Sequence, residues 1–230
     1  MNKFSQILLE ATNLKKTYDG GLVQAVHDVS ITLEKGKLYV LSGRSGCGKS
    51  TLLHLLGTLD TPDRGTILFE GNAFESMDSL TRFRRENLGF IFQFQHLLPL
   101  LSLRENVETA LVFCHKFSDA ERRERVDSIL IDVGLEDRMH QYANLVSGGE
   151  RQRAAIARAL VTHPKLILAD EPTGNVDSLT AKAIMEILKE RIQKEGMTAL
   201  VATHDPLVRA YADTIFYMED GHIQRVENAH

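Results

Sequence analysis

Residues 43–50 read Gly-Arg-Ser-Gly-Cys-Gly-Lys-Ser and match the pattern G-x-x-x-x-G-K-S/T in full. Glycines let the backbone wrap closely enough for its N–H groups to point at phosphate oxygens. In this pattern Lys49 reaches the β- and γ-phosphates, and the Ser50 hydroxyl is a ligand for Mg²⁺. The spacing therefore predicts a loop that binds a nucleoside triphosphate.

Acidic and imidazole side chains follow two later apolar runs. Asp170 and Glu171 come directly after residues 166–169, and His204 comes directly after residues 199–203. In open α/β sheets, ligands bind outside the carboxyl ends of the strands. These three residues are therefore candidates for the same site as the phosphate loop.

The elements that must position these residues alternate between short apolar runs and helical segments, which is typical of a mostly parallel sheet with crossover helices. Asp220-Gly221 is a hairpin turn signal, and residues 118–121 form a capping-box pattern that opens a helix. The expected strands are residues 7–13, 26–33, 38–42, 66–69, 88–92, 166–169, 199–203, 215–218 and 222–226. The other expected helices are residues 49–56 and 149–161.

Further motifs follow the phosphate loop in a fixed order. Residues 146–150 read Val-Ser-Gly-Gly-Glu, residues 166–171 read Leu-Ile-Leu-Ala-Asp-Glu, and residues 174–177 read Gly-Asn-Val-Asp. Together with Gln93 and His204, they resemble the signature motif, Walker B strand, D-loop, Q-loop and switch histidine of ABC ATPases. The resemblance extends over about residues 8–223.

The resemblance implies an α/β fold: a P-loop NTPase core with a mostly parallel sheet, an antiparallel β subdomain and an inserted α-helical subdomain. One ABC ATPase domain is expected over residues 1–230, with the helical subdomain at about 83–146.

The same resemblance implies the site residues. Glu171 would polarise the attacking water as general base, assisted by His204 and Gln93. Hard oxygen ligands for Mg²⁺ would come from Ser50, Gln93 and Asp170, and Tyr18 would stack on adenine. The expected nucleotide-binding residues are Tyr18, Gly43, Arg44, Ser45, Gly46, Cys47, Gly48, Lys49, Ser50, Thr51, Ser147, Gly148, Gly149 and Glu150.

The signature residues are expected to act on a second chain. Ser147, Gly148 and Gly149 begin a helix, and a helix N-terminus attracts anions. In the family this end faces the γ-phosphate bound by the other subunit, so a head-to-tail dimer around two ATP molecules follows, two-fold symmetric if homomeric. Glu150 stands where the family more often has Gln and adds negative charge there.

Three features resemble a bacterial class that includes lipoprotein-release and macrolide-export ATPases: residues 147–150, residues 172–177, and residues 93–99 with 105–107. The function implied is a motor for a membrane permease that exports or extracts lipoprotein, lipid-linked or amphipathic cargo. The alternative is a regulatory ABC ATPase of a cell-division or wall-hydrolase complex that transports nothing. Apolar residues after the predicted strand at 88–92 either pack the helical subdomain or form a protein interface: Phe92, Phe94, Leu97, Leu98 and Leu100.

Composition sets the remaining expectations. The 230 residues carry a net charge of -4, which argues against a nucleic-acid partner. Two cysteines are too few for a disulfide framework and fit a reducing cytosol. No run approaches eighteen apolar residues and no signal-peptide pattern begins the chain, so direct membrane insertion is not expected. The chain is expected in the cytoplasm, peripheral on the inner face of the membrane through its permease.

Overall fold

The computed structural model describes residues 6–114, 117–174 and 176–228. Its strands are β1 (Ile7–Tyr18), β2 (Val23–Glu34), β3 (Leu38–Ser42), β4 (Arg64–Phe69), β5 (Asn72–Ala73), β6 (Leu88–Ile91), β7 (Leu166–Asp170), β8 (Thr198–Thr203), β9 (Thr214–Glu219) and β10 (His222–Asn228). Its α-helices are α1 (Lys49–Leu56), α2 (Leu80–Asn87), α3 (Leu103–Glu108), α4 (Asp119–Asp132), α5 (Gly148–Leu160), α6 (Ser178–Glu195) and α7 (Pro206–Arg209).

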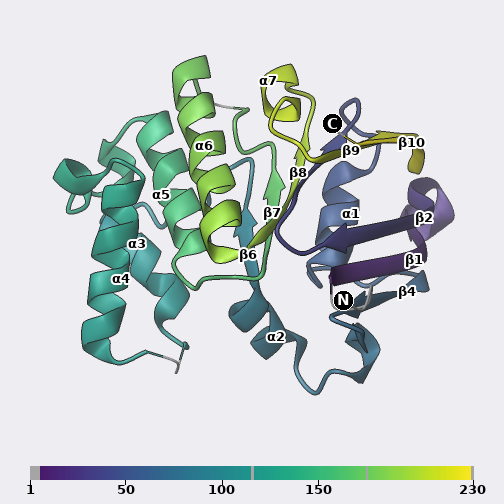
Figure 1. Cartoon of the computed structure of the whole chain (residues 1–230), viewed down its shortest axis with the longest axis horizontal. Helices are drawn as coiled ribbons and strands as arrows, with labels where there is room; N and C mark the ends of the chain where they lie inside the picture. The colour runs from purple at the N-terminus through teal and green to yellow at the C-terminus, as the bar shows by residue number, and fades with distance from the viewer. Residues whose placement is uncertain (1–5, 115–116, 175, 229–230) are drawn as a thin grey trace.

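The strands form two sheets. A six-stranded sheet has the order β10-β9-β3-β8-β7-β6, in which only β10 pairs antiparallel to its neighbour. A four-stranded antiparallel sheet has the order β2-β1-β4-β5. In Figure 1, α3 to α6 lie on one side of the six-stranded sheet, whereas α1 and the antiparallel sheet lie on the other. The expected α/β fold with an antiparallel β subdomain is confirmed.

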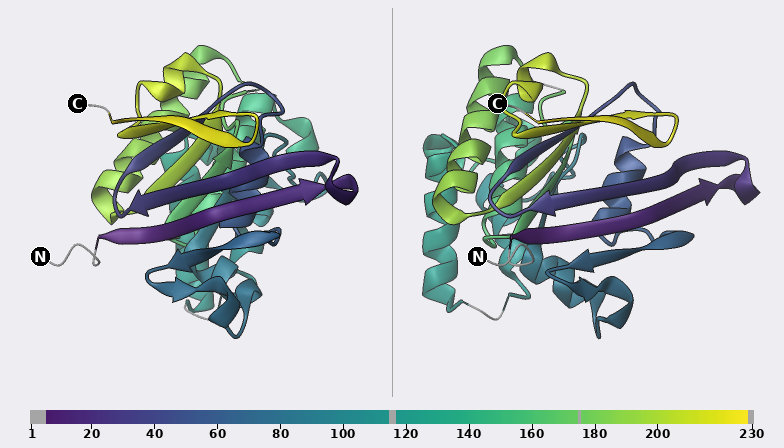
Figure 2. Two further views of the ribbon diagram at one scale, coloured as in Figure 1. Left: turned by 90° about the vertical axis from the view of Figure 1, so that its right-hand side faces the viewer. Right: turned by 45° about the vertical axis from the view of Figure 1, so that its right-hand side comes forward.

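Side chains of the central strands point alternately to the two faces of the sheet, and each face has its own hydrophobic core. Leu38 and Val40 of β3 belong to the core that includes residues of α4, α5 and α6. Tyr39 and Leu41 of the same strand belong to the core that includes α1, β1, β2 and β4. Successive side chains of a strand point to opposite faces, so a parallel strand covered on both faces is buried throughout, as β3 is. Figure 2 shows β1 and β2 as a long hairpin along this second core.

The order of the strands brings the candidate residues together. β8 pairs with both β3 and β7, with Ser42 opposite Thr203 and Ala202 opposite Asp170. All three strands are parallel, so the segments that follow them leave the sheet at the same edge. This places the phosphate loop, the acids after β7 and the histidine after β8 at neighbouring positions.

Several expected elements are observed with the same bounds, and others differ by a few residues. β3 and α1 are as predicted, and α4 begins after the predicted cap at Ser118, with its capping box formed. The helix expected at 149–161 begins at Gly148, because Ser147 caps it. Helices α2, α3, α6 and α7 were not predicted. Asn175 of the predicted D-loop lies outside the described residues.

The expected helical subdomain at about 83–146 includes α3 and α4, and also β6, which pairs with β7 in the six-stranded sheet. Its limits stay a prediction. Among the residues that the structure describes, no helix combines the length and apolarity required to cross a bilayer.

Candidate nucleotide-binding site

A cavity of about 410 Å³ lies where the phosphate loop, the start of α1 and the ends of β1, β7 and β8 meet. It collects most of the residues predicted from the sequence: Tyr18, Ser45, Gly46, Gly48, Lys49, Ser50, Thr51, Gln93, Asp170, Glu171 and His204. The start of β2 and Gly174 complete its wall. We call this the nucleotide cavity.

Two glycines of the loop have no room for a side chain. A Cβ on Gly48 would lie 2.0 Å from the carbonyl oxygen of Ala25, and φ is +103° at this position. A Cβ on Gly43 would lie 2.2 Å from the carbonyl oxygen of Met218. The loop therefore packs against β2 and β9 through its backbone, which leaves its other side for a ligand. Because no side chain caps α1 at Gly48, the first N–H groups of this helix remain for an anion.

Lys49 places its ammonium group inside the loop. The side chain is buried, and Nζ donates to the carbonyl oxygens of Gly43 at 2.8 Å and Arg44 at 3.0 Å. A buried ammonium group held by neutral carbonyls favours an anionic ligand, because a phosphate would supply the opposite charge.

Glu171 and His204 form a pair across two strands. Glu171 Oε1 lies 2.8 Å from His204 Nδ1, and Thr203 Oγ1 donates to Glu171 Oε2 at 2.9 Å. The Glu171 backbone is left-handed, with φ of +44°, and its N–H donates to Ala202 O at 2.8 Å. A left-handed non-glycine residue stores strain, which the surrounding bonds must offset. The carboxylate is thus fixed at the cavity wall, as a general base must be.

Thr203 is a site residue that the sequence interpretation missed. Besides its bond to Glu171, its Oγ1 accepts the N–H of Asp205 at 3.0 Å, and Thr173 Oγ1 donates to Asp205 Oδ2 at 3.4 Å. The hydroxyl therefore ties the segment after β7 to the segment after β8. The signal available in the sequence was a polar residue between the apolar run 199–202 and His204; in the structure this side chain is fully buried.

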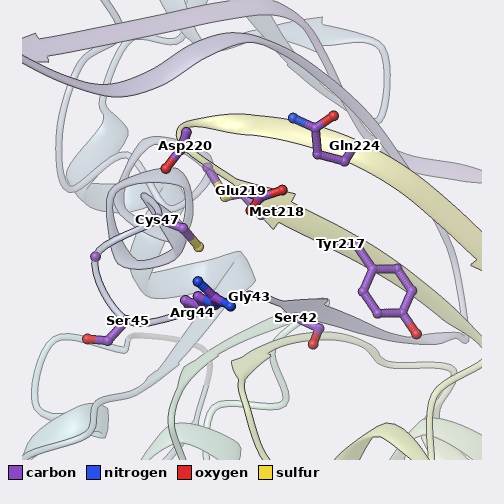
Figure 3. A pocket seen from close by; sticks show the side chains of 11 residues that line it. Ser42, Gly43, Arg44, Ser45, Cys47, Tyr217, Met218, Glu219, Asp220 and Gln224 are labelled. Carbon is purple, nitrogen blue, oxygen red and sulfur yellow. The ribbon is translucent and has the colours of Figure 1, made fainter.

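The side of the loop that faces the β9–β10 hairpin lines a second cavity of about 410 Å³. Gly43, Arg44 and Cys47 line this second cavity and not the nucleotide cavity, whereas Ser45 and Gly46 line both. Figure 3 shows Cys47 between the loop and the turn of the hairpin. Cys47 is buried, and its backbone oxygen accepts the N–H of Gly221 at 3.1 Å.

The four signature residues lie outside the nucleotide cavity of their own chain. Ser147 caps α5: the Glu150 N–H donates to Ser147 Oγ at 3.3 Å, and the Ser147 N–H donates to Glu150 Oε2 at 2.7 Å. Hydrogen bonds from the Ser147 hydroxyl and N–H, and then the charge of Arg138, hold the pKa of Glu150 below its usual range. Arg138 Nε lies 3.3 Å from Glu150 Oε1.

The residues expected to hold Mg²⁺ share the nucleotide cavity. Ser50, Gln93 and Asp170 all line it and offer hydroxyl, amide and carboxylate oxygens, the donors that Mg²⁺ prefers. Within the described residues, no cluster of three or more His, Cys, Asp or Glu side chains is arranged to hold a metal.

Comparison with known proteins agrees with this geometry. The profile of the ABC transporter family matches residues 26–174. The chain therefore belongs to the ABC transporter family: it is an ABC ATPase, which binds and hydrolyses ATP. The expected membership of the class with macrolide-export ATPases is confirmed by the relatives described next.

The macrolide export ATP-binding/permease protein MacB 1 of Yersinia pestis bv. Antiqua is 43% identical over 220 residues, which are 94% of this chain and 34% of MacB 1. The chain thus spans about a third of the length of such relatives. An uncharacterized ABC transporter ATP-binding protein of Methanocaldococcus jannaschii, MJ1508, is 41% identical over 96% of this chain and 100% of its own length.

Solved structures of ABC cassettes are also similar to this chain. The ATP-binding cassette MJ0796, in a dimeric post-hydrolysis state bound to ADP and Pi, has a TM-score of 0.90 and 38% identity over 96% of this chain and 98% of that one. The cbiO1 protein of Clostridium perfringens, part of the ABC transporter complex cbiONQ, has a TM-score of 0.87 and 30% identity over 97% of this chain and 89% of that one.

Proposed function

We propose that two copies of this chain enclose two Mg-ATP molecules and drive a membrane permease that exports or extracts lipoprotein, lipid-linked or amphipathic cargo. The observation that carries the proposal is the division of the site. The phosphate loop, the acids after β7 and His204 line one cavity, whereas the signature residues cap a helix outside it. A site of this kind is complete only when a second chain supplies its signature helix.

In this proposal the phosphates lie on the N-terminus of α1, with Lys49 on the β- and γ-phosphates. Ser50, Gln93 and Asp170 hold Mg²⁺, whose charge offsets that of the phosphates. Glu171 accepts a proton from the attacking water, and His204 and Thr203 fix the carboxylate for that transfer.

A second chain is supported by exposed apolar side chains beside the signature residues and the start of α6. Tyr142 is 52% exposed, Leu145 is 71% exposed and Leu179 is 82% exposed. Exposed apolar groups that gather on one face indicate a protein interface. The related cassette MJ0796 has been solved as a dimer, which agrees with this role.

A permease partner is supported by the segment after β6. Phe94 is 67% exposed, Leu98 is 52% exposed and Leu100 is 79% exposed, so these three side chains are available to a partner. In contrast, Leu97 packs against the core, and Phe92 is half-buried with its ring stacked 5.7 Å from Phe90. The five apolar residues therefore divide between the two expected roles.

The name of the MacB relatives combines ATP-binding and permease parts in one protein. This supports a role at the inner face of a membrane, reached through a permease. The regulatory alternative has the same ATP chemistry and differs only in its partner.

The test is to purify tagged Glu171→Gln protein from mild-detergent membranes with MgATP and to identify the proteins that copurify by mass spectrometry. A permease with few transmembrane helices and a large extracytoplasmic domain supports the export or extraction role. Partners tied to division or wall hydrolases would overturn the transport role and leave the ATPase assignment intact. Phe94→Ser serves as a matched variant that should lose the permease without losing ATP hydrolysis.

A further inference from the structure

The hydroxyl of Tyr18 lies beside the Thr51 side chain, which lines the nucleotide cavity, and it is held by a carboxylate that does not line that cavity. Tyr18 ends β1, lines the cavity and is 37% exposed. Its hydroxyl donates to Asp60 Oδ2 at 2.7 Å. Asp60 lies beyond the end of α1, the helix that begins in the phosphate loop. The Asp60 carboxylate therefore links the Tyr18 side chain to the segment that follows α1.

The same carboxylate holds a lysine beside the ring. Lys16 Nζ donates to Asp60 Oδ1 at 2.8 Å and to the carbonyl oxygen of Thr61 at 2.8 Å. This ammonium group lies 5.3 Å from the centroid of the Tyr18 ring, within the range of a cation–π contact. The Thr61 N–H donates to Asp60 Oδ1 at 2.7 Å, so the carboxylate is fixed by its own backbone as well.

The charges of this group persist at neutral pH. Burial alone would raise the pKa of Asp60, but the hydrogen bonds from Lys16 and Tyr18 outweigh it and lower the pKa. The hydrogen bond to Asp60 raises the pKa of Lys16. Asp60 is therefore a carboxylate and Lys16 an ammonium group at neutral pH.

We propose that Asp60, with Lys16, is a positioning residue for nucleotide binding: it fixes the Tyr18 ring in the orientation that stacks on the base. This inference rests on the proposed ATP site and on the stacking of Tyr18 on adenine that the sequence predicts. A ring held before the ligand arrives loses less rotational freedom on binding, so the anchor raises affinity without touching the nucleotide. Because the anchor acts only at the base, it leaves the phosphate contacts and the chemical step unchanged.

A neighbouring aspartate offers a matched control. Asp63 Oδ2 accepts the Thr17 N–H at 2.7 Å and the Thr17 hydroxyl at 2.8 Å, and Asp63 lies 3.8 Å from Lys16. Asp63 thus links β1 to the segment after α1, as Asp60 does. Among the hydrogen bonds of the described residues, however, none joins Asp63 to Tyr18. Loss of Asp63 loosens the strand and leaves the Tyr18 hydroxyl bond in place.

The experiment measures the KM for ATP, kcat, and inhibition by tripolyphosphate, which has the phosphates but no base. Asp60→Ala and Tyr18→Phe are each expected to raise the KM for ATP about three- to tenfold, the worth of one hydrogen bond. We expect kcat at saturating ATP and the inhibition constant of tripolyphosphate to stay unchanged. The two substitutions together should raise KM no more than either alone, and Asp63→Ala should leave it unchanged.

Tyr18→Phe removes only the hydroxyl, so it tests the proposal even if Asp60→Ala folds poorly. An unchanged KM for ATP in Tyr18→Phe would overturn the positioning role. So would an inhibition constant of tripolyphosphate that rises in Asp60→Ala as much as the KM for ATP does. The Tyr18→Ala variant shows whether only the positioning role of Asp60 has failed or the stacking of Tyr18 on the base has failed as well. If Tyr18→Ala also leaves KM unchanged, rather than raising it roughly 5- to 150-fold, then Tyr18 does not stack on the base.

Discussion

The N-termini of α1 and α5 are both proposed to bind a phosphate, but they differ in what already occupies them. No side chain caps α1 at Gly48, and Lys49 lies buried beside the open N–H groups. At α5, Ser147 and Glu150 already bond each other's backbone N–H groups, and Ser147 is exposed. In our proposal the first end therefore binds phosphate within its own chain, whereas the second meets a phosphate that a partner chain holds.

The two ends also differ in charge. Lys49 places a positive charge inside the phosphate loop, whereas Glu150 places a negative charge at the start of α5. Arg138, at 3.3 Å, offsets that charge. This compensation explains how Glu150 can stand at an end that is proposed to face an anion.

The largest effect expected is at the α1 end. Lys49→Ala removes the buried ammonium group and should weaken ATP binding about 100-fold or more, the worth of two charge-assisted hydrogen bonds. Titration calorimetry with ATP measures it. Lys165→Ala is the control. Lys165 Nζ lies 2.6 Å from Glu70 Oε2, and neither residue lines the nucleotide cavity. An ATP affinity equal to that of the wild type would contradict the assignment of the phosphate loop.

Next in size is the loss of the general base. Glu171→Gln keeps the shape of the side chain but cannot accept a proton, so turnover should fall roughly 10²- to 10⁴-fold while MgATP still binds. Phosphate release measures turnover, and Glu186→Gln on the exposed side of α6 is the control. Near-normal turnover would remove Glu171 from its proposed role.

The α5 end should show a smaller effect that depends on the partner chain. Ser147→Ala removes the helix cap and one donor for the phosphate, so ATP-dependent dimerisation should weaken about tenfold. The ATP affinity of the separate chains should not change. Sedimentation at several protein concentrations measures the dimer.

Ser118→Ala is the matched control for that experiment, because Ser118 forms the same capping box with Glu121 on α4. Each substitution should cost about 1 kcal/mol of stability, visible as a small decrease in Tm. Only Ser147→Ala should weaken the dimer. If both variants lost the dimer equally, Ser147 would affect dimerisation only through the stability of the folded chain.

The smallest effect concerns the charge of Glu150. Its pKa is lowered in the folded chain, so its stabilising bonds are complete above the unfolded pKa and are lost as pH falls through the folded value. The Tm difference between wild type and Glu150→Gln should therefore be largest near neutral pH and shrink below about pH 4, where glutamates protonate. A difference that grew on acidification would contradict this assignment.

Local signals in the sequence were sufficient for the elements beside the phosphate loop. An apolar run before a glycine-rich turn fixed β3 and α1, and a capping box fixed the start of α4. The long helix α6 has equal signals in the sequence, an aspartate directly before its start and a glycine directly after its end; in the structure Asp177 caps the helix and Gly196 ends it with φ of +67°.

The sequence predicted that Glu171 and His204 share a site, but it did not give the individual contacts between distant segments. The 2.8 Å approach of Glu171 to His204 depends on β7 and β8 being neighbours. The anchoring of Tyr18 by Asp60 depends on how the antiparallel sheet packs beside α1. No local pattern encodes either pair, because each arises only when the strands have been ordered.

The central claim is that ATP completes an interface between two chains. Sedimentation velocity of Glu171→Gln protein, with and without MgATP, tests it most directly. The account predicts the 25.8 kDa chain without nucleotide and a species of twice that mass with MgATP. A protein that binds ATP yet keeps the same mass in both conditions would contradict it.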